Sequence, residues 1–169
     1  ESKNYNDIWG SFVVLSAKDQ SVVRNLLISG GSESWIGGMY FSGQMAFHDS
    51  DVELFDSYFF NAKADDALNI KNSKIKINNC IFFNNKADGF DGDSVQGTIE
   101  FSNFINNKGD GIDLSFSKVL SQDNIIINTG DKGISAGEVS KVLVVNNVIK
   151  NSDIGIASKD NSEVEITNS

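Results

Sequence analysis

The sequence predicts an all-β protein in which short strands wind into stacked coils. Ile, Val and Phe recur in short alternating runs between Asn and Gly, a composition that favours strands. No stretch keeps the apolar spacing of a helix for long enough to predict one. The third observation is a period of 22 residues, which separates Gly89, Gly111, Gly133 and Gly155. A fixed period of this length is typical of a solenoid.

Several columns of residues share this period. The position after each repeated glycine is apolar, and Ala67 extends the glycine column by one step: Leu68, Phe90, Ile112, Ile134, Ile156. A second apolar column contains Phe82, Phe104, Ile126 and Val148, and a polar column contains Asn84, Asn106 and Asn128. We expect the apolar columns to point inward, and the asparagines to bond along the axis as a ladder.

Each unit contains three short strands separated by polar corners. Parallel stacking of such units at about 4.8 Å would build a core that no unit could form alone. A left-handed helix of hexapeptides would show a six-residue period, which is absent, and a sandwich or barrel would not keep the period so strictly. The prediction is therefore a right-handed parallel β-helix with about 22 residues per coil.

The chain is predicted to be a single β-helix domain over residues 1–169, with an irregular part at 1–50 and regular coils at 51–169. In the irregular part, "SESWIGGMYFSGQMAFHDS" lengthens one connection. Such insertions lie on one face of a solenoid and often carry binding. The last segment, "SEVEITNS", stops in mid-coil, so we expect a fragment of a longer chain.

Four segments resemble the parallel β-helix repeats of the pectate-lyase-like superfamily: "KINNCIFFNNKADGF", "GTIEFSNFINNKGDGI", "VLSQDNIIINTGDKGI" and "VLVVNNVIKNSDIGI". The resemblance covers about residues 50 to 169. It is specific for the fold and weak for function, because enzymes, adhesins and stalks share the repeat. The chain is also similar to bacterial surface β-helices, which implies an extracellular or cell-surface location.

The charge of the chain excludes some partners. It has 23 acidic and 14 basic residues, a net charge of -9, and a single arginine, Arg24. Because no basic patch could neutralise phosphates, nucleic acid is not expected as a partner. A transmembrane segment is not expected either, since no apolar run of sufficient length occurs. Cys80 has no partner for an internal disulfide and is predicted to be a small buried hydrophobe.

Acidic residues form columns of their own. At the 22-residue period, Asp91 aligns with Asp113, and Lys132 continues the longer column of Asp66, Asp88 and Asp110. Adjacent carboxylates repel, and Ca²⁺, which binds carboxylate oxygens, is the predicted cofactor. The metal ligands in this interpretation are Asp66, Asp88, Asp91, Asp110 and Asp113. Two alternatives are lysine pairing, with Lys71 beside Asp93 and Lys132 beside Asp110, and turns in which aspartates accept from backbone amides.

The resemblance also implies an enzymatic alternative. Some pectate-lyase-like β-helices hold Ca²⁺ with aspartates and use a basic residue to abstract the C5 proton of a uronate. Lys132 is the candidate for that base. The acidic face, the single arginine and the short chain count against this activity. The aspartate-flanked proline and histidine motif of alginate epimerases is also missing, since the chain has no proline.

The irregular part contributes further candidates. Trp35 and Tyr40 could stack against sugar rings, or a tryptophan could plug the end of the coil stack. His48, beside two aspartates, is a candidate base or metal ligand and equally an ordinary surface histidine. Five phenylalanines are expected to stack in the core: Phe55, Phe59, Phe60, Phe82, Phe83.

The sequence thus predicts a non-catalytic extracellular or surface β-helix module. Its acidic face, with Ca²⁺ as a candidate cofactor, would contact a polysaccharide or a surface protein. The alternative is a calcium-dependent, lyase-like enzyme that acts on a uronate-containing polysaccharide.

Overall fold

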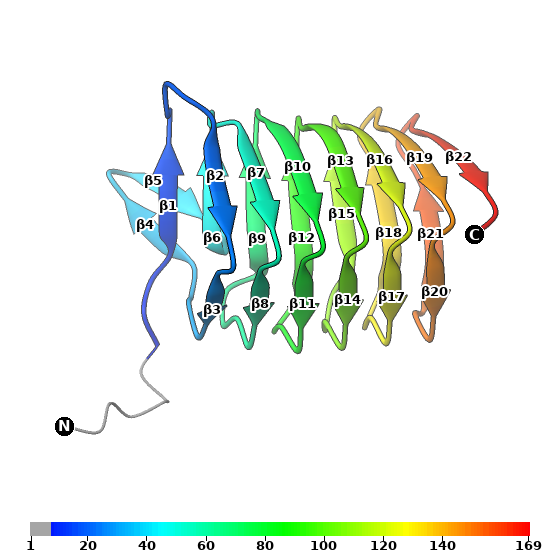
Figure 1. Ribbon diagram of the computed structural model, residues 1–169, viewed down its shortest axis with the longest axis horizontal. Helices are drawn as coiled ribbons and strands as arrows, with labels where there is room; N and C mark the ends of the chain where they lie inside the picture. The colour runs from blue at the N-terminus through cyan, green and yellow to red at the C-terminus, as the bar shows by residue number, and fades with distance from the viewer. Residues whose placement is uncertain (1–7) are drawn as a thin grey trace.

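The structure is a computed structural model that describes residues 8–169; residues 1–7 of the irregular part lie outside the described residues. Its strands stack as successive coils along one axis (Figure 1). Each coil passes through three parallel sheets, which we number 1 to 3 in the order in which the chain meets them. The predicted parallel β-helix is confirmed.

Sheets 1 and 2 each contain seven strands, and sheet 3 contains six. Sheet 1 is formed by β1 (Phe12–Leu15), β6 (Gly43–His48), β9 (Asp66–Lys71), β12 (Asp88–Asp93), β15 (Ile112–Ser115), β18 (Lys132–Gly137) and β21 (Ile154–Ser158). Sheet 2 is formed by β2 (Ser21–Arg24), β7 (Val52–Phe55), β10 (Lys74–Asn78), β13 (Gln96–Glu100), β16 (Lys118–Gln122), β19 (Lys141–Val145) and β22 (Glu163–Thr167). Sheet 3 is formed by β3 (Leu27–Ser29), β8 (Tyr58–Phe60), β11 (Ile81–Phe83), β14 (Asn103–Ile105), β17 (Ile125–Ile127) and β20 (Val148–Lys150).

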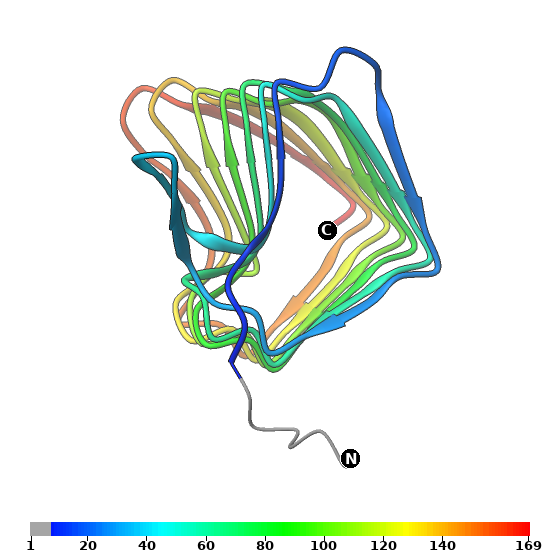
Figure 2. The ribbon, with the colours of Figure 1, turned by 90° about the vertical axis from the view of Figure 1, so that its left-hand side faces the viewer.

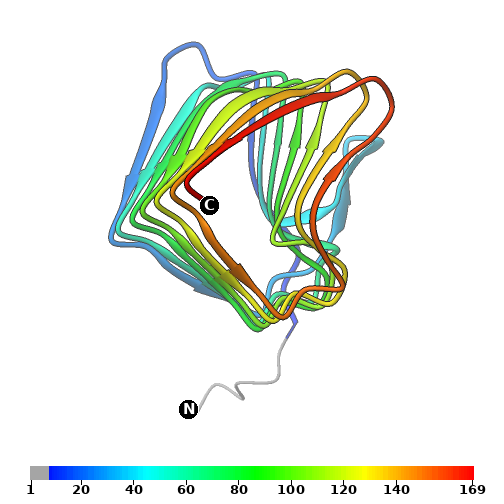
Figure 3. The same cartoon turned by 90° about the vertical axis from the view of Figure 1, so that its right-hand side faces the viewer.

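The first coil carries an antiparallel hairpin of β4 (Ser34–Ile36) and β5 (Met39–Phe41). In the view down the axis this hairpin projects from the body of the coil (Figure 2). At the opposite end of the stack, β22 of sheet 2 is the last strand, and the C-terminus lies beside the interior (Figure 3). The predicted insertion is therefore a defined hairpin on one side of the solenoid.

The inward columns form the core. Leu68, Phe90, Ile112 and Ile134 pair in register and are fully buried, as predicted. In the second column Phe82 stacks on Phe59 and Phe104, with ring centroids 4.8 and 4.6 Å apart. Cys80 is buried beside them, and burial raises the pKa of its thiol to about 11.

One member of the second column was predicted wrongly. Ile126 pairs with Ile149, whereas Val148 is 42% exposed. The cause lies in the corner between β18 and β19, where Glu138 and Val139 both have positive φ. In the corresponding corner of the preceding coil only Phe116 has a positive φ. This corner holds one extra residue, so β19 and β20 pair with the preceding coil at a spacing of 23 residues instead of 22. Relative to the 22-residue period, each side chain of these strands therefore lies on the opposite face.

Three of the predicted core phenylalanines lie on outer faces instead. Phe59 and Phe82 are buried, but Phe83 is 42% exposed and Phe60 is partly exposed. Phe55 faces outward from sheet 2, where the Arg24 guanidinium lies 3.9 Å from its ring centroid. Because neighbouring strand residues point to opposite faces, adjacent phenylalanines cannot both enter the core.

Most corners between sheets contain a residue in the left-handed conformation. Asn72, Asn79 and Asn84 occupy the three corners of one coil, with φ of 48°, 53° and 57°. Asparagine tolerates this conformation better than other non-glycine residues, which accounts for its abundance. Proline, whose φ is fixed near −65°, cannot occupy these positions, and the chain has none.

Asparagine side chains bond along the axis in two places. On the surface, Asn128 Nδ2 donates to Asn106 Oδ1 at 2.9 Å, so the predicted ladder is confirmed for this pair. A second ladder is buried: Asn85 Nδ2 donates to Asn107 Oδ1 at 2.8 Å, and Asn107 Nδ2 donates to the Phe82 carbonyl at 3.2 Å. The inner ladder satisfies backbone groups where the coil turns away from sheet 3.

The repeated glycines sit where the interior is too narrow for a side chain. A Cβ on Gly89 would lie 2.8 Å from the Gly111 carbonyl oxygen and 2.9 Å from Phe104 Cδ1. Close stacking between coils therefore explains the glycine column. Within residues 8–169, no helix is long and apolar enough to cross a membrane.

Candidate functional site

Polar side chains gather on the outer face of sheet 1, the face opposite the core. Three columns lie there, each with one residue per coil, as the strand register and the coil-to-coil hydrogen bonds place them. The edge column is Asp66, Asp88, Asp110 and Lys132; the central column is Asn69, Asp91, Asp113 and Ser135; the third column is His48, Lys71, Asp93 and Ser115. The structure therefore brings all the predicted acidic residues together on one face.

Carboxylates of the edge column accept from backbone amides one coil further on. Asp88 Oδ1 accepts from the Asp110 amide at 2.7 Å, and Asp110 Oδ1 accepts from the Lys132 amide at 2.7 Å. These bonds support the structural alternative, in which the aspartates fix the turn that leads into sheet 1. They leave the second oxygen of each carboxylate for other partners.

The central column begins with a chain of side-chain hydrogen bonds. His48 Nε2 lies 2.7 Å from Asn69 Oδ1, and Asn69 Nδ2 donates to Asp91 Oδ2 at 2.6 Å. Asp113 and Ser135 continue the column in register. His48, which the sequence assigned to the irregular part, thus belongs to the regular sheet face, at the end of β6.

Both lysines of this face are already paired. Lys71 Nζ lies 2.6 Å from Asp93 Oδ2, and Lys132 Nζ lies 3.5 Å from Asp110 Oδ1 and also contacts Asp131. The predicted lysine–aspartate pairs are confirmed. In the described residues, none of Asp88, Asp91 and Asp113 forms an ion pair.

Burial disfavours the charged form of several of these carboxyls. Desolvation raises the pKa of Asp88 to about 7, and the charges of Asp66 and Asp110 add to the effect. Desolvation also raises the pKa of Asp66 to about 6, and the charge of Asp65 adds to the effect. The pKa of Asp91 is raised well above its ordinary value, first by desolvation and then by neighbouring aspartates.

Lys132 is held as an ammonium. Its hydrogen bond to Asp131 is the main cause that raises its pKa, with further support from the charge of Asp110. Its side chain is only 16% exposed. A lysine with these contacts is a poor proton acceptor at neutral pH.

The hairpin lies beside this polar face. Its turn, Gly37–Gly38, has φ of 59° and 84°, which suits glycine. The rings of Trp35 and Tyr40 pack with centroids 5.3 Å apart, and Trp35 is 73% exposed. Tyr40 Oη donates to Asp65 Oδ2 at 3.2 Å, one residue before the edge column.

Phe41 anchors the hairpin on sheet 1. It is fully buried, and its ring centroid lies 4.7 Å from that of His48. The hairpin that carries Trp35 and Tyr40 therefore packs against the polar face through the contact between Phe41 and His48. A tryptophan plug does not describe Trp35, because most of its surface is open to solvent.

Two buried polar atoms on the outer face of sheet 1 have no hydrogen-bond partner: Asp66 Oδ2 and Ser135 Oγ. Asp66 is 4% exposed and Ser135 is fully buried. In residues 8–169, no three or more His, Cys, Asp or Glu side chains are arranged to hold a metal ion. The side chains as they stand form a hydrogen-bonding surface, and calcium stays a prediction.

Sequence reasoning missed four members of the site: Asn69, Ser115, Ser135 and Asp65. Asn69 and Ser135 lie one period before Asp91 and one period after Asp113, so the 22-residue register could have placed them. Asp65 contacts Tyr40 through the hairpin, and no repeat signal could have shown that contact.

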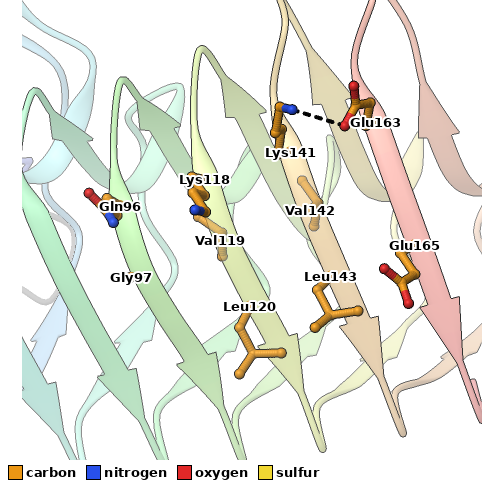
Figure 4. Close-up of a pocket in the computed structure, with 10 residues that line it drawn as sticks. All are labelled: Gln96, Gly97, Lys118, Val119, Leu120, Lys141, Val142, Leu143, Glu163 and Glu165. Atoms are coloured by element: carbon orange, nitrogen blue, oxygen red, sulfur yellow. Dashed lines mark ion pairs between the residues drawn. The ribbon is translucent and has the colours of Figure 1, made fainter.

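A separate groove of about 430 Å³ lies on sheet 2 (Figure 4). Lys118, Leu120, Leu143 and Glu165 are among its lining residues. Lys141 and Glu163 form an ion pair of 3.1 Å at its rim. None of the predicted site residues lines this groove.

Comparison with known proteins adds to this description. A family model described as "Right handed beta helix region" matches residues 66–169. Among solved structures, the periplasmic alginate epimerase AlgG is similar with a TM-score of 0.64 and 13% identity, over 95% of this chain and 43% of that chain. A point mutant of AlgG gives a TM-score of 0.67 and 15% identity, over 95% and 43% of the two chains. The search of curated proteins gave no match.

At these identities the likeness shows the fold alone. The chain spans less than half the length of the epimerase structures that it matches, 43% of that chain. The predicted right-handed winding of the parallel β-helix is confirmed.

Proposed function

The chain belongs to the family of right-handed β-helix proteins, and on that premise we propose that it is a carbohydrate-binding module. Its binding surface would be the outer face of sheet 1 together with the hairpin. We further propose that it acts outside the cytoplasm, at a cell surface or in the extracellular space. The periplasmic location given for AlgG supports this location by analogy.

The observation that carries the proposal is an exposed aromatic pair beside a row of hydrogen-bonding groups. Trp35 and Tyr40 present ring surface to solvent at the border of the edge column. Carbohydrates offer apolar C–H faces that pack on aromatic rings and hydroxyls that bond to carboxylates and amides. Both kinds of contact occur side by side where the hairpin borders sheet 1.

Binding measurements with a panel of polysaccharides would test the proposal. Trp35→Ala and Tyr40→Ala should each weaken binding about tenfold, because each removes stacking area without touching the core. Tyr58→Ala is the matched control, since Tyr58 is exposed to a similar degree (45% against 40% for Tyr40) but lies on sheet 3. Equal losses in all three variants would contradict the assignment of the surface.

We also propose calcium as a cofactor to be tested. Carboxylate oxygens suit Ca²⁺, and Asp88, Asp91 and Asp113 lack cationic partners in the described residues. A cation that binds only the folded stack should raise its melting temperature by mass action. A melting temperature that neither millimolar Ca²⁺ nor a chelator changes would remove calcium from the proposal.

A second candidate function is lyase-like chemistry on a uronate. The raised pKa of Asp88 to about 7 favours it, because catalytic carboxyls often titrate near neutrality. The paired ammonium of Lys132 argues against that residue as the base. Release of unsaturated product from polygalacturonate or alginate would favour an enzyme, and Lys132→Ala would then show whether this lysine takes part.

A further inference from the structure

We infer that the glycan bound on the outer face of sheet 1 carries positive charge, in the form of free amino groups on its sugars. This inference rests on the proposed carbohydrate-binding function and names the ligand class. It follows from the balance of charge on the face, from unsatisfied hydrogen-bonding atoms and from the spacing of the columns.

The charge on this face is strongly unbalanced. Its three columns contain two lysines and six aspartates: Asp66, Asp88, Asp91, Asp93, Asp110 and Asp113. The lysines are paired with Asp93 and with Asp110. The middle of the face, around Asp91 and Asp113, therefore presents carboxylates without a protein cation among the described residues.

A negatively charged glycan would meet repulsion here. The single arginine of the chain lies on sheet 2, where its guanidinium covers the ring of Phe55. It is not available to grip a uronate on sheet 1. An ammonium group brings the missing charge and three hydrogen-bond donors, which match carboxylates that only accept.

Two buried atoms add an independent requirement for a ligand. Ser135 Oγ has no hydrogen-bond partner. Its neighbours Ile134 and Ala136 point into the core, so the Ser135 side chain points to the outer face, in register with Asp113. Asp66 Oδ2 is also without a partner at the border nearest the hairpin. Buried polar atoms are normally satisfied, so both ends of the face lack a contact that a ligand or solvent must supply.

The columns also suit a polymer. Successive carboxylates of one column are separated by the distance between parallel strands, about 4.8 Å. An extended glycan that lies along the solenoid axis advances by a similar length for each sugar. Amino groups along such a chain could then meet carboxylates of successive coils, such as Asp91 and Asp113.

Titration calorimetry with a glucosamine oligosaccharide, its N-acetylated counterpart and oligogalacturonate tests the inference. We expect the glucosamine oligomer to bind about tenfold tighter than the N-acetylated oligomer, with an affinity that falls as salt is added. The double variant Asp91→Asn/Asp113→Asn should lose about this tenfold preference, because each amide keeps the shape but not the charge. Its melting curve checks that it folds.

The matched control is Glu163→Gln/Glu165→Gln, which removes two charges from sheet 2 and should leave the preference unchanged. An oligolysine of equal charge measures attraction to the net charge alone. Equal affinity for oligolysine and the glucosamine oligomer, or an equal loss in both double variants, would overturn the inference.

The remaining outcomes separate the inference from the proposed function. Equal binding of the glucosamine and N-acetylated oligomers would overturn the inference and leave carbohydrate binding intact. Binding of oligogalacturonate alone, dependent on Ca²⁺, would overturn it in favour of a calcium bridge. Binding of no glycan would overturn both proposals.

Discussion

The outer faces of sheets 1 and 3 differ sharply although they share the same coils. Sheet 1 presents aspartates, amides and paired lysines, whereas sheet 3 presents apolar side chains over a shallow hollow of about 360 Å³. That hollow is lined by Leu27, Tyr58, Phe60, Ile81 and Phe83. The inward columns of both sheets are equally apolar and buried. The fold is thus specified by inward columns and corners, and the outward columns are free to take up function.

The strongest way to break this comparison is to place a charge in an inward column. Ile112→Asp would bury a carboxylate between Phe90 and Ile134, at a cost of about 4 kcal/mol or more, and should prevent stable folding. Asp113→Asn, one residue further on the outer face, should be nearly silent. Circular dichroism melting curves measure both, and equal destabilisation would show that inward and outward positions are not distinct.

The same contrast applies to the two asparagine ladders. Asn107→Ala removes a buried amide that bonds Asn85 and the Phe82 carbonyl, and should cost about 2 kcal/mol. Asn106→Ala removes the surface bond from Asn128 and puts alanine at a φ of 58°, and should cost about 1 kcal/mol. Urea denaturation would rank the two variants, and the reverse order would mean that the surface ladder holds the coils together.

The raised pKa of Asp88 sharpens the comparison by making sheet 1 sensitive to pH. Below its ordinary pKa of 3.8 this carboxyl is protonated in both states; between 3.8 and about 7 the unfolded chain releases the proton while the folded chain retains it. Stability should therefore decrease as pH rises through this window. In Asp88→Asn the melting temperature should fall by several degrees less across this pH window than in the parent protein.

Asp66→Asn is the comparison variant, because its window ends near pH 6 rather than pH 7. Melting temperatures recorded from pH 4 to 8 would distinguish the two. Profiles parallel to that of the parent protein would mean that desolvation does not govern these carboxyls.

The smallest effects are expected at the two lysine ion pairs, those of Lys132 and Lys141. Lys132→Ala removes the contacts to Asp110 and Asp131 and should reduce stability by about 1 kcal/mol, the upper end of the range for exposed pairs, because the side chains of Lys132 and Asp110 are only 16% and 7% exposed. Lys141→Ala, which removes a more exposed pair on sheet 2, should have no measurable effect. A loss of stability several times larger in Lys132→Ala would contradict this expectation and would mean that the Lys132 contacts hold the outer face of sheet 1 together.

The period made most of the fold predictable from the sequence. Burial forces the inward residues to repeat in both spacing and chemistry, so Leu68, Phe90 and Ile112 could be aligned without a structure. Val148 could not be placed, because the extra corner residue near Val139 is compensated before Gly155 and leaves the glycine spacing intact. Strands of three residues, such as Ile81–Phe83, are too short for alternation to assign a face.

The candidate site was predictable in position more than in detail. The register alone brought the acidic residues together, because positions one period apart must be neighbours in a parallel stack. Which oxygen bonds an amide, and which stays without a partner, depends on side-chain geometry at Asp66 and Asp88. The hairpin contact of Tyr40 with Asp65 joins segments outside the repeat, and periodicity carries no information about it.

The stacking direction has a mechanical consequence. Backbone hydrogen bonds between coils, such as that from the Asn106 amide to the Ile127 carbonyl, run along the solenoid axis. A force that pulls the two ends apart along this axis acts equally on every layer of bonds, because the layers are connected in series. The weakest layer therefore opens first. The molecule should therefore lengthen by unwinding coil by coil, at low and nearly constant force, rather than by shearing all its strands at once.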